Sequence, residues 1–496
     1  MFRLRRMCID TLSEHVVFIH EGAVAEGRLG FQPLDRVRLL AENGRELIGV
    51  LNFCKDALLT RDEIGLSDVA FHDFGLPEGA RVRATHAPAP ESVERVRHKL
   101  RGGRLSRADF DAVLRDVCAR RYSKPELAMF VLACALRQLD RPELVSFTEA
   151  MIACGSRLTF DARVVVDKHS IGGIPGNRTT MIVVPIVAAL GLTMPKTSSR
   201  AITSPSGTAD TMGALAEVAL RPEEIQRVVA KTGGCIVWGG ALDLAPADDV
   251  LITVERPMGI DTEAQMIASI LSKKKTAGAT HALIDVPIGP SAKVRTHRAG
   301  EELAESFRYV GDAIGLSLDI VLTDAHGPIG CGVGPRLEAL DVLAVLERKP
   351  DAPRDLREKS LFLAARLLER AGAVPDAFGY RAAQEALDSG AALARFQAIR
   401  AAQGLRELPP AAPFRALVPA RGDGRVRALD CLRIARIAKL AGAPANPSAG
   451  LRVLCRVGDV VSRGQPLLEV HAQSEAQLGF AVAHAEQAEG LVELGF

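Results

Sequence analysis

The sequence lacks a strong net charge. Its 496 residues carry 62 lysines and arginines against 60 aspartates and glutamates, which gives a formal net charge of +2. A protein that holds nucleic acid or an anionic membrane through a global basic field needs a clear excess of cations. The balance excludes such a field and favours a small, discrete ligand.

Cysteine pairs and long apolar runs are also missing. The nine cysteines form no C-x-x-C, and most have apolar neighbours, as in "FVLACAL" and "RVLCRV". This pattern indicates buried thiols in a reducing cytosol rather than a disulfide or zinc framework. No segment has the roughly 18 uninterrupted apolar residues of a membrane span, and the basic start "MFRLRRMCIDTLSEHV" lacks the apolar stretch of a signal peptide. We therefore expect a soluble, cytoplasmic protein.

The first third of the chain divides into a β part and an α part. Residues 1–88 predict a small N-terminal β domain, because "DRVRLLA" and "ELIGVLNF" flank Asn43-Gly44, a strong hairpin signal. Residues 89–160 predict an α-helical domain, in which Ser123 caps a helix and Pro125 fits its first turn. We expect a helix at about 261–278 to join this domain in space.

The rest of the chain predicts a multidomain α/β protein. In residues 161–346 short apolar runs alternate with glycine turns and helical stretches, which favours a mostly parallel sheet with ligands at the carboxyl ends of its strands. A helical connection follows at 347–407, and "LPPAAP" precedes a C-terminal α+β domain at 414–496. That domain resembles the hammerhead of biotinyl and lipoyl carriers, but no lysine stands at a hairpin tip, so we expect a structural role.

The segment "DKHSIGGIPGNRTT", residues 167–180, follows a short strand and is rich in hydrogen-bond donors. Lys168 supplies a charge and Ser170 a hydroxyl, and three glycines let several backbone N–H groups face one anion ahead of a helix. The G-x-x-x-x-G-K-[ST] order is absent, so this is not a Walker loop. The alternative interpretation is a tight strand-to-helix connection.

A second donor-rich segment is "KTSSRAITSPSGTADTMGAL", residues 196–215. Its many Ser and Thr hydroxyls, with Arg200 among them, have no use in a core. Such loops are often merely solvated, but the apolar "VVPIVAALGLTMP" before this one should fix it against the sheet. Two such loops can hold two anionic groups, or one phosphate and the hydroxyls of a sugar.

The third segment, "GIDTEAQMIASILSKKKTAG", predicts a helix that starts near Asp261 and ends at Gly278. Asp261 is either only its cap or a functional acid. Gln265, Ser269 and Lys273 follow at steps of four and line one face. The next two lysines, Lys274 and Lys275, are interpreted as a solvated helix end favoured by the helix dipole.

Together, "VDKHSIGGIPGN", "SSRAITSPSGTADTM", "LAPADD", "ASILSKKK" and "VPIGPSAKV" resemble motifs of the thymidine and pyrimidine nucleoside phosphorylases, and most closely those of the AMP phosphorylase branch. The resemblance runs from about Glu91 to the C-terminus, and an extra N-terminal β domain is typical of that branch. It implies a glycosyltransferase of the pentosyltransferase type. Inorganic phosphate displaces a base from a pentose and leaves a pentose 1-phosphate, or ribose 1,5-bisphosphate from a nucleotide. Phosphate is the co-substrate, and no metal or other cofactor is expected.

The resemblance also assigns roles to residues. Asp261 matches a proposed proton donor, and we expect it to be partly buried in the closed enzyme, since a carboxylic acid donates near neutral pH only if its pKa is raised. His169 matches a histidine near the base, or else is structural. The matches to phosphate ligands are Lys168, Ser170, Thr180, Ser198 and Thr208. The matches to nucleoside or nucleotide ligands are Gly173, Ser199, Arg200, Ala201, Ile202, Thr203, Ser204, Thr208, Ser269, Lys273 and Lys293.

The sequence departs from the pyrimidine enzymes in its "AITSPSGT" segment and in the inserted Pro175. The arginine that grips the pyrimidine carbonyl also has no clean counterpart, because ungapped matching puts Val254 in its place, with Thr253 before it and Arg256 two residues later. These departures favour a nucleoside 5'-monophosphate over thymidine, with Arg200, Thr203 and Ser204 available for the second phosphate.

Two other interpretations stay open. One is a phosphoribosyltransferase of the anthranilate type, which would need a magnesium-binding acidic pair, with Asp248 and Asp249 as the nearest candidates. The other is a nucleotide-binding protein without catalysis, against which Asp261, Ser269 and Lys273 together argue. The family forms dimers through its helical domain, so we expect a homodimer or a larger homo-oligomer, and the β domain can extend the assembly. We also expect the helical and α/β domains to close on the substrates.

Overall fold

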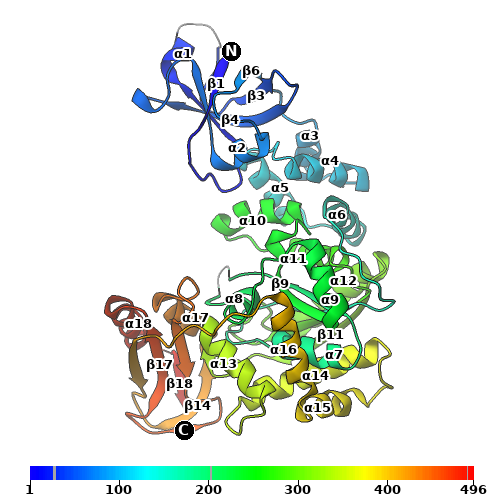
Figure 1. The fold of residues 1–496 in the computed structure, drawn as a ribbon, viewed down its shortest axis with the longest axis vertical. Helices are drawn as coiled ribbons and strands as arrows, with labels where there is room; N and C mark the ends of the chain where they lie inside the picture. The colour runs from blue at the N-terminus through cyan, green and yellow to red at the C-terminus, as the bar shows by residue number, and fades with distance from the viewer. Residues whose placement is uncertain (26–29, 202–203, 489, 496) are drawn as a thin grey trace. The chain divides into compact units, whose positions relative to one another are not determined.

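A computed structural model describes residues 1–25, 30–201, 204–488 and 490–495. Two compact units make up the chain. The first unit contains Met1–Gly155 and Ala245–Ser272, and the second contains Ser156–Leu244 and Lys273–Phe496. Each unit is described by itself below, and Figure 1 gives the labels of the elements.

The first unit begins with a closed β-barrel, drawn in blue in Figure 1. The predicted hairpin at Asn43-Gly44 is confirmed, because β3 and β4 pair antiparallel with Leu40 opposite Glu46, and Gly44 has a φ of +80°. The barrel order is β1-β5-β2-β4-β3-β6. Its strands are β1 (Phe2–Arg6), β2 (Val16–His20), β3 (Arg36–Ala41), β4 (Glu46–Cys54), β5 (Glu63–Leu66) and β6 (Arg81–His86), with helices α1 (Glu21–Ala25), η1 (Asp56–Leu58) and α2 (Asp68–Phe74).

Helices form the remainder of the first unit. Four come from the segment after the barrel: α3 (Ser92–Leu100), α4 (Arg107–Cys118), α5 (Lys124–Leu136) and α6 (Arg141–Cys154). As predicted, Ser123 stands at the N-cap of α5, where its backbone N–H donates to Glu126, and Pro125 lies in the first turn. Two further helices come from later in the chain, α10 (Pro246–Met258) and the start of α11 (Glu263–Thr276). Val250 and Ala268 of these two helices share one apolar core with α3–α6.

The second unit holds the predicted parallel α/β arrangement. Strands β7 (Val166–Ser170), β10 (His281–Ile288) and β11 (Ser317–Asp324) form a parallel sheet with β10 in the middle, and β8 (Met194–Ser198) pairs parallel with β9 (Gly234–Trp238). A parallel bridge between Val165 and Thr193, the residues just before β7 and β8, links these two strands. The expectation of a mostly parallel sheet is therefore confirmed.

Helices cover this sheet. Helix α7 (Thr180–Ala189) is apolar and buried, and it packs on α14 (Arg354–Arg370) and α16 (Ala391–Gln403) in the largest core of the molecule's described residues. The other helices of this region are α8 (Thr208–Gly213), α9 (Pro222–Thr232), η2 (Gly239–Ala241), α12 (His297–Ala313), α13 (Pro335–Leu346) and α15 (Gly379–Asp388).

The C-terminal part of the second unit is the expected α+β domain, drawn in orange and red in Figure 1. Its larger sheet has the order β12-β15-β17-β13, and its smaller sheet the order β16-β14-β18. The strands are β12 (Gly332–Val333), β13 (Phe414–Pro419), β14 (Gly424–Leu429), β15 (Gly450–Val453), β16 (Val460–Val461), β17 (Pro466–Ala472) and β18 (Val492–Gly495), and the helices are α17 (Cys431–Leu440) and α18 (Glu475–Gln487). Strand β12 comes from the α/β region, so this sheet ties the two regions together.

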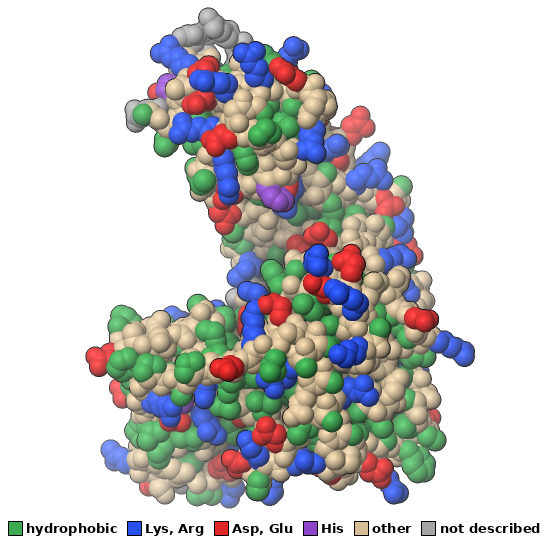
Figure 2. Space-filling model, viewed as in Figure 1, with side chains coloured by type: hydrophobic (Ala, Val, Ile, Leu, Met, Phe, Trp, Pro, Cys, Tyr) green, Lys and Arg blue, Asp and Glu red, His purple; other side chains and the backbone are tan. Residues whose placement is uncertain are grey.

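The surface and the cysteines agree with the composition. On the face drawn in Figure 2, lysine and arginine side chains are interspersed with acidic ones, without a single extended basic patch. All nine cysteines are free thiols and five of them are buried. Among the residues that the structure describes, no helix has the length and apolar character required to cross a membrane.

Candidate active site

The first donor loop lies where the sequence placed it, between β7 and α7. Lys168 is fully buried, and its ammonium donates a 2.9 Å hydrogen bond to the hydroxyl of Thr179. Ser170, at the end of β7, donates to Asp285 at 2.9 Å and accepts from the amide of Asn177 at 3.2 Å. The carboxyl end of β7 is therefore a fixed array of polar groups.

A second segment of the chain supports this loop. Gly173 and Gly176 have positive φ angles, and a Cβ on Gly176 would lie 2.2 Å from the carbonyl oxygen of Ile329. The backbone N–H of Ile329 in turn donates to the carbonyl of Pro175 at 3.1 Å. The glycine-rich loop after β11 thus holds the first donor loop in place.

Arg178 joins the first donor loop to the second. Its guanidinium is buried, donates to the hydroxyl of Thr208 at 3.2 Å and to the carbonyl of Ser206 at 2.6 Å, and pairs with the carboxylate of Glu338 on α13. Ser198 lies at the end of β8, the strand that precedes this loop. One arginine that the sequence did not single out therefore joins the first donor loop to Thr208, one of the expected phosphate ligands.

The second loop folds tightly on itself. The N–H of Ala209 donates to the carbonyl of Ser199, and the N–H of Ala201 donates to Asp210 at 2.6 Å. Gly207 permits this turn, since a Cβ there would lie 2.5 Å from the Ser199 carbonyl oxygen. Ser204 donates to the carbonyl of Ser206 at 3.0 Å. Two of the expected ligands, Ile202 and Thr203, lie outside the described residues.

A buried cluster of charged side chains lies close to His169. Asp167 pairs with Lys274 at 2.7 Å and with Lys196 at 3.5 Å, and all three are buried. The expectation that Lys274 forms a solvated helix end is therefore wrong, because the buried carboxylate of Asp167 needs a cation beside it. Lys275 does behave as a helix end, donating to the carbonyl of Gly315 at 2.8 Å.

This cluster sets the charge of its neighbours. Burial lowers the pKa of His169 well below its usual value, and the ammonium groups of Lys274 and Lys196 lower it further. Burial likewise lowers the pKa of Lys196 to about 7, against the attraction of Asp167. His169 is therefore a neutral imidazole at physiological pH. It can donate a hydrogen bond to a nucleobase or accept one from it, but it carries no charge.

Helix α11 begins at Glu263, one residue later than expected if Asp261 were its cap. The hydroxyl of Thr262 accepts from the backbone N–H of Gln265 at 3.2 Å and donates to its amide oxygen at 2.7 Å, so Thr262 and not Asp261 caps this helix. Asp261 is exposed in this structure. The interpretation of Asp261 as the cap is therefore wrong, and its role as a functional acid stays a prediction.

The face of α11 is also less uniform than predicted. Gln265 is buried, whereas Ser269 and Lys273 are partly exposed. Lys273 is close enough to lower the pKa of His169. Asp261 and Ser269 belong to the first unit, while Lys273 and the phosphate loops belong to the second. Val254, which the sequence matched to the pyrimidine-gripping arginine, is buried in the core of the helical part.

Lys293 lies beside the first donor loop. A Cβ on Gly173 would meet the backbone nitrogen of Lys293 at 3.3 Å, so the chain after β10 runs directly against this loop. Thr180, the first residue of α7, is buried. Lys293 is thus close to the first donor loop, and Thr180 directly follows Thr179, which accepts a hydrogen bond from Lys168.

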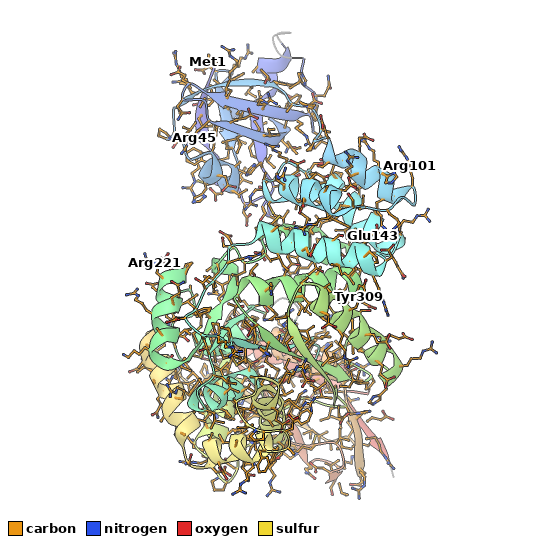
Figure 3. All side chains as sticks on the ribbon, turned by 90° about the vertical axis from the view of Figure 1, so that its right-hand side faces the viewer. Met1, Arg45, Arg101, Glu143, Arg221 and Tyr309 are labelled. Carbon is orange, nitrogen blue, oxygen red and sulfur yellow. The ribbon has the colours of Figure 1, made fainter. Side chains whose placement is uncertain are left out.

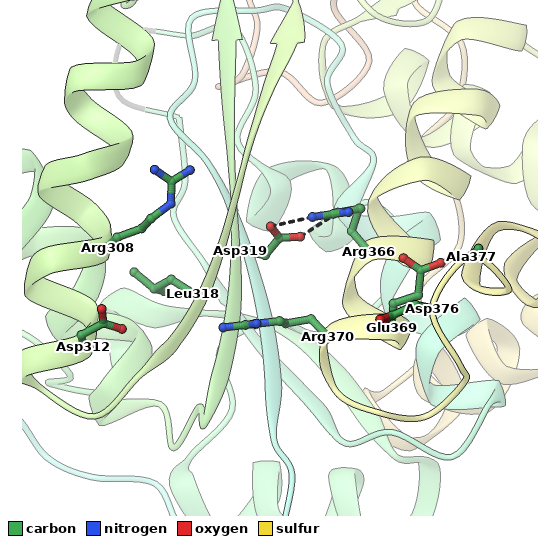
Figure 4. Close-up of a pocket in the computed structure, with 9 residues that line it drawn as sticks. All are labelled: Arg308, Asp312, Leu318, Asp319, Arg366, Glu369, Arg370, Asp376 and Ala377. Atoms are coloured by element: carbon green, nitrogen blue, oxygen red, sulfur yellow. Dashed lines mark hydrogen bonds and ion pairs between the residues drawn. The ribbon is translucent and has the colours of Figure 1, made fainter.

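The second unit also has cavities, two of which adjoin β11. One, of about 710 Å³, is at the amino end of β11, and Figure 4 shows the pair of Asp319 with Arg366 in it. The other, of about 1010 Å³, is lined by the loop after β11, by α14 and by the C-terminal domain. Among the described residues, none of the predicted ligands lines either cavity, although Thr323, Ile329 and Lys359 line the second.

The sequence analysis did not single out Asp285, the buried carboxylate that accepts the hydrogen bond from Ser170. Asp285 stands alone in the apolar run "HALIDVPIG", and a lone charge inside a predicted buried strand is itself a signal of a special site. Arg178 gave no comparable signal, because an arginine in a polar loop is ordinary.

Taken together, cations and hydroxyl donors meet at the carboxyl ends of β7 and β8, which suits a phosphate-sized anion. Family models match three parts of the chain: the helical bundle domain of a glycosyl transferase family at residues 93–155, the a/b domain of the same family at 162–393, and the pyrimidine nucleoside phosphorylase C-terminal domain at 425–490. The fold and these matches define a pentosyltransferase.

Relatives identify the family within that class. A protein of Polaromonas sp. named "Putative thymidine phosphorylase" is 50% identical over 97% of this chain and 94% of its own length, and one of the same name from Methylococcus capsulatus is 48% identical over 97% and 93%. The chain belongs to the thymidine and pyrimidine nucleoside phosphorylase family.

The fold is shared more widely. The crystal structure of anthranilate phosphoribosyltransferase from Thermus thermophilus aligns with a TM-score of 0.53 at 20% identity, covering 62% of this chain and 98% of that one. The likeness at this identity concerns the fold alone.

Proposed function

We propose that this protein cleaves the N-glycosidic bond of a nucleoside 5'-monophosphate with inorganic phosphate, giving the free base and ribose 1,5-bisphosphate. The observation that carries this proposal is the junction of the two donor loops through Arg178, which bonds both Thr208 and Ser206. Arg178 is itself paired with Glu338, so its role is to fix the loop that follows β8. This loop carries Arg200 and Ser204. A second phosphate group on the substrate needs more positive charge and more hydrogen-bond donors than a nucleoside does.

The chemistry suits the residues. Breaking the bond develops positive charge on the sugar and negative charge on the leaving base, so the enzyme must place an anionic nucleophile below the ring and donate a proton to the base. In this proposal Lys168, Ser170, Thr180, Ser198 and Thr208 hold inorganic phosphate, and Asp261 donates the proton. Inorganic phosphate is the co-substrate, and the proposal requires no metal or other cofactor.

The remaining residues bind the nucleotide. Arg200, Thr203 and Ser204 take the 5'-phosphate, and Ser269 and Lys273 face the base with neutral His169 nearby. The other proposed contacts of the nucleotide are Gly173, Ser199, Ala201, Ile202 and Lys293. We further propose a cytoplasmic homodimer or larger homo-oligomer.

A second candidate is a thymidine or pyrimidine nucleoside phosphorylase proper, which the names of the relatives favour. Against it, ungapped matching to the pyrimidine enzymes gives a valine, Val254, where they have the arginine that grips the base, and this valine is buried. The two candidates differ in whether the substrate carries a 5'-phosphate.

The test is release of free base from thymidine, uridine, AMP, CMP and UMP, each with and without inorganic phosphate and without added metal. Phosphate-dependent release from the monophosphates is expected, and Asp261→Asn should be nearly silent. The matched control is Glu263→Gln, which changes an exposed carboxylate in the first turn of α11 and should stay active. Release from thymidine or uridine alone would instead establish the second candidate.

A further inference from the structure

We propose that Asp285 is a positioning residue of the phosphate site, which fixes the hydroxyl of Ser170 and the ammonium of Lys168, and that Lys359 and Thr323 hold Asp285 in turn. This inference rests on the proposed function only in assuming that Lys168 and Ser170 bind phosphate.

Every part of the Asp285 carboxylate is occupied. One oxygen accepts from Ser170 at 2.9 Å and lies 3.1 Å from the ammonium of Lys359, and the other accepts from the hydroxyl of Thr323 at 2.5 Å. The ammonium of Lys168 lies 4.0 Å away. Asp285 is completely buried, so these four groups replace the water that a carboxylate would otherwise require.

The topology explains the meeting of these groups. Strand β10 lies between β7 and β11, and Asp285 is directly opposite Ser170 and Val321. Side chains alternate between the two faces along a strand, and residues paired across neighbouring strands point to the same face. One face of the sheet therefore carries Lys168, Ser170, Asp285 and Thr323. Helix α14 packs against β10 and supplies Lys359.

Hydrogen bonds connect the group continuously. Lys168 donates to Thr179, Thr179 donates to Asn177, and Asn177 donates to Ser170. Ser170 then donates to Asp285. On the other side Lys359 donates to Thr323, which donates to Asp285. Both proposed phosphate ligands on β7 are thus tied, through the chain, to this one carboxylate.

Charge gives Asp285 a second effect. Burial lowers the pKa of Lys168 to about 8, the attraction of Asp285 opposes that change, and the cations Lys359 and Arg178 add to it. Asp167, on the same strand as Lys168, raises this pKa slightly. Burial alone would raise the pKa of Asp285, but Lys168 and Lys359 hold it below its usual value. Lys168 is therefore a cation at neutral pH largely because Asp285 is an anion.

The structure supplies a matched control. Arg366, seven residues after Lys359 on the same helix, pairs with Asp319 on β11 at 2.8 Å, at the opposite end of the strand (Figure 4). Arg366→Met removes the same kind of helix-to-strand ion pair without touching the phosphate loops.

The experiment measures binding of inorganic phosphate alone by calorimetry across pH, with base release in parallel. For Asp285→Asn the dissociation constant of phosphate should rise by about tenfold or more. The pH at which binding is lost on the alkaline side should move down. For Lys359→Met that pH should move up, because a repelling cation next to Lys168 is gone. Lys359→Arg should restore the original value, and Arg366→Met should behave as the unchanged protein.

The outcomes separate the two claims. Opposite shifts for Asp285→Asn and Lys359→Met support the inference even if no substrate is cleaved, in which case only the proposed function fails. Folding of Asp285→Asn is checked by circular dichroism. If this variant does not fold, the inference is tested by Lys359→Met alone, through the rise in the pH at which phosphate binding is lost and its return to the original value in Lys359→Arg. Unchanged phosphate binding in the variants, an equal loss in Arg366→Met, or no phosphate binding by the unchanged protein would overturn the inference.

Discussion

Arg200 stacks on Trp238, with the guanidinium carbon 4.5 Å from the centroid of the indole ring. Trp238 is the only tryptophan of the chain and ends β9, so it presents a rigid surface to an otherwise exposed arginine. Such stacking orients a cation and contributes about 0.5 to 2 kcal/mol. If Arg200 binds a 5'-phosphate, Trp238 sets its position.

Replacing Trp238 with leucine should therefore weaken binding of the nucleotide selectively. We expect the KM for AMP to rise by roughly 2- to 30-fold. The KM for a nucleoside without the 5'-phosphate should stay the same, and Trp238→Phe should retain most of the affinity. Equal losses for both substrates would show that Trp238 supports the whole loop rather than Arg200.

Gly176→Ala should disrupt the phosphate site through backbone contact. The new Cβ would lie 2.2 Å from the Ile329 carbonyl oxygen, so the first donor loop must move. We expect weaker phosphate binding, measured as a smaller rise in melting temperature on addition of phosphate. Gly191→Ala is the control, because Gly191 has a similar positive φ and open space around its Cβ position. A similar loss in the control would assign the effect to backbone strain alone.

Lys99 and Glu143 form a buried ion pair in the helical part of the first unit, where Figure 3 labels Glu143. Both side chains are about 96% buried, and Glu143 also accepts from the backbone N–H of Leu105 at 2.8 Å. Lys99→Met leaves an unpaired buried carboxylate and should cost about 3 to 5 kcal/mol of unfolding free energy, measured by urea denaturation. The double variant with Glu143→Gln should recover most of it, since the amide oxygen still accepts from Leu105. No recovery would place the loss in packing rather than charge.

Asp341 should make stability depend on pH. Burial raises the pKa of its carboxyl from 3.8 to about 6, although the N–H groups of Gly332 and Cys331 donate to it. Between these values the folded protein binds more protons than the unfolded chain, so stability falls as pH rises through this window and is lowest above it. The total loss is on the order of 3 kcal/mol.

Asp341→Asn removes this dependence while keeping an oxygen for the two N–H groups. Urea midpoints at about pH 4.5 and about pH 7.5 test it, with the variant more stable than the unchanged protein only at the higher pH. A variant equally stabilised at both values would contradict the raised pKa.

The sequence predicted the elements better than the contacts among charged groups. Asn43-Gly44, Ser123 and the apolar strands each act through their own neighbours, and all of them lie where local chemistry placed them. Lys274 shows the limit. Its position on the helix suggested solvent, but a strand far away in the sequence brings Asp167 to it. Pairing across such a separation leaves no local pattern.

The same limit applies to the candidate site. Lys168 and Ser170 belong to a segment whose composition is unusual by itself, so the sequence sufficed to select them. Asp285 and Lys359 matter through what they touch, and those contacts arise only when three strands and a helix assemble. The sequence also left the capping residue of α11 open between neighbours. Both aspartate and threonine can cap a helix, and only the structure shows that Thr262 does so rather than Asp261.

The divided first unit has a consequence for how the chain folds during synthesis. The core shared by α3–α6 includes Val250 and Ala268, which the ribosome adds about 100 residues after α6. Until then, the helices made first expose apolar surface, and both donor loops emerge in between. Domains generally fold as they are completed, from the N-terminus onward. Here the barrel can fold early, but the helical part must wait, and a chain truncated before α10 would lack a stable helical core.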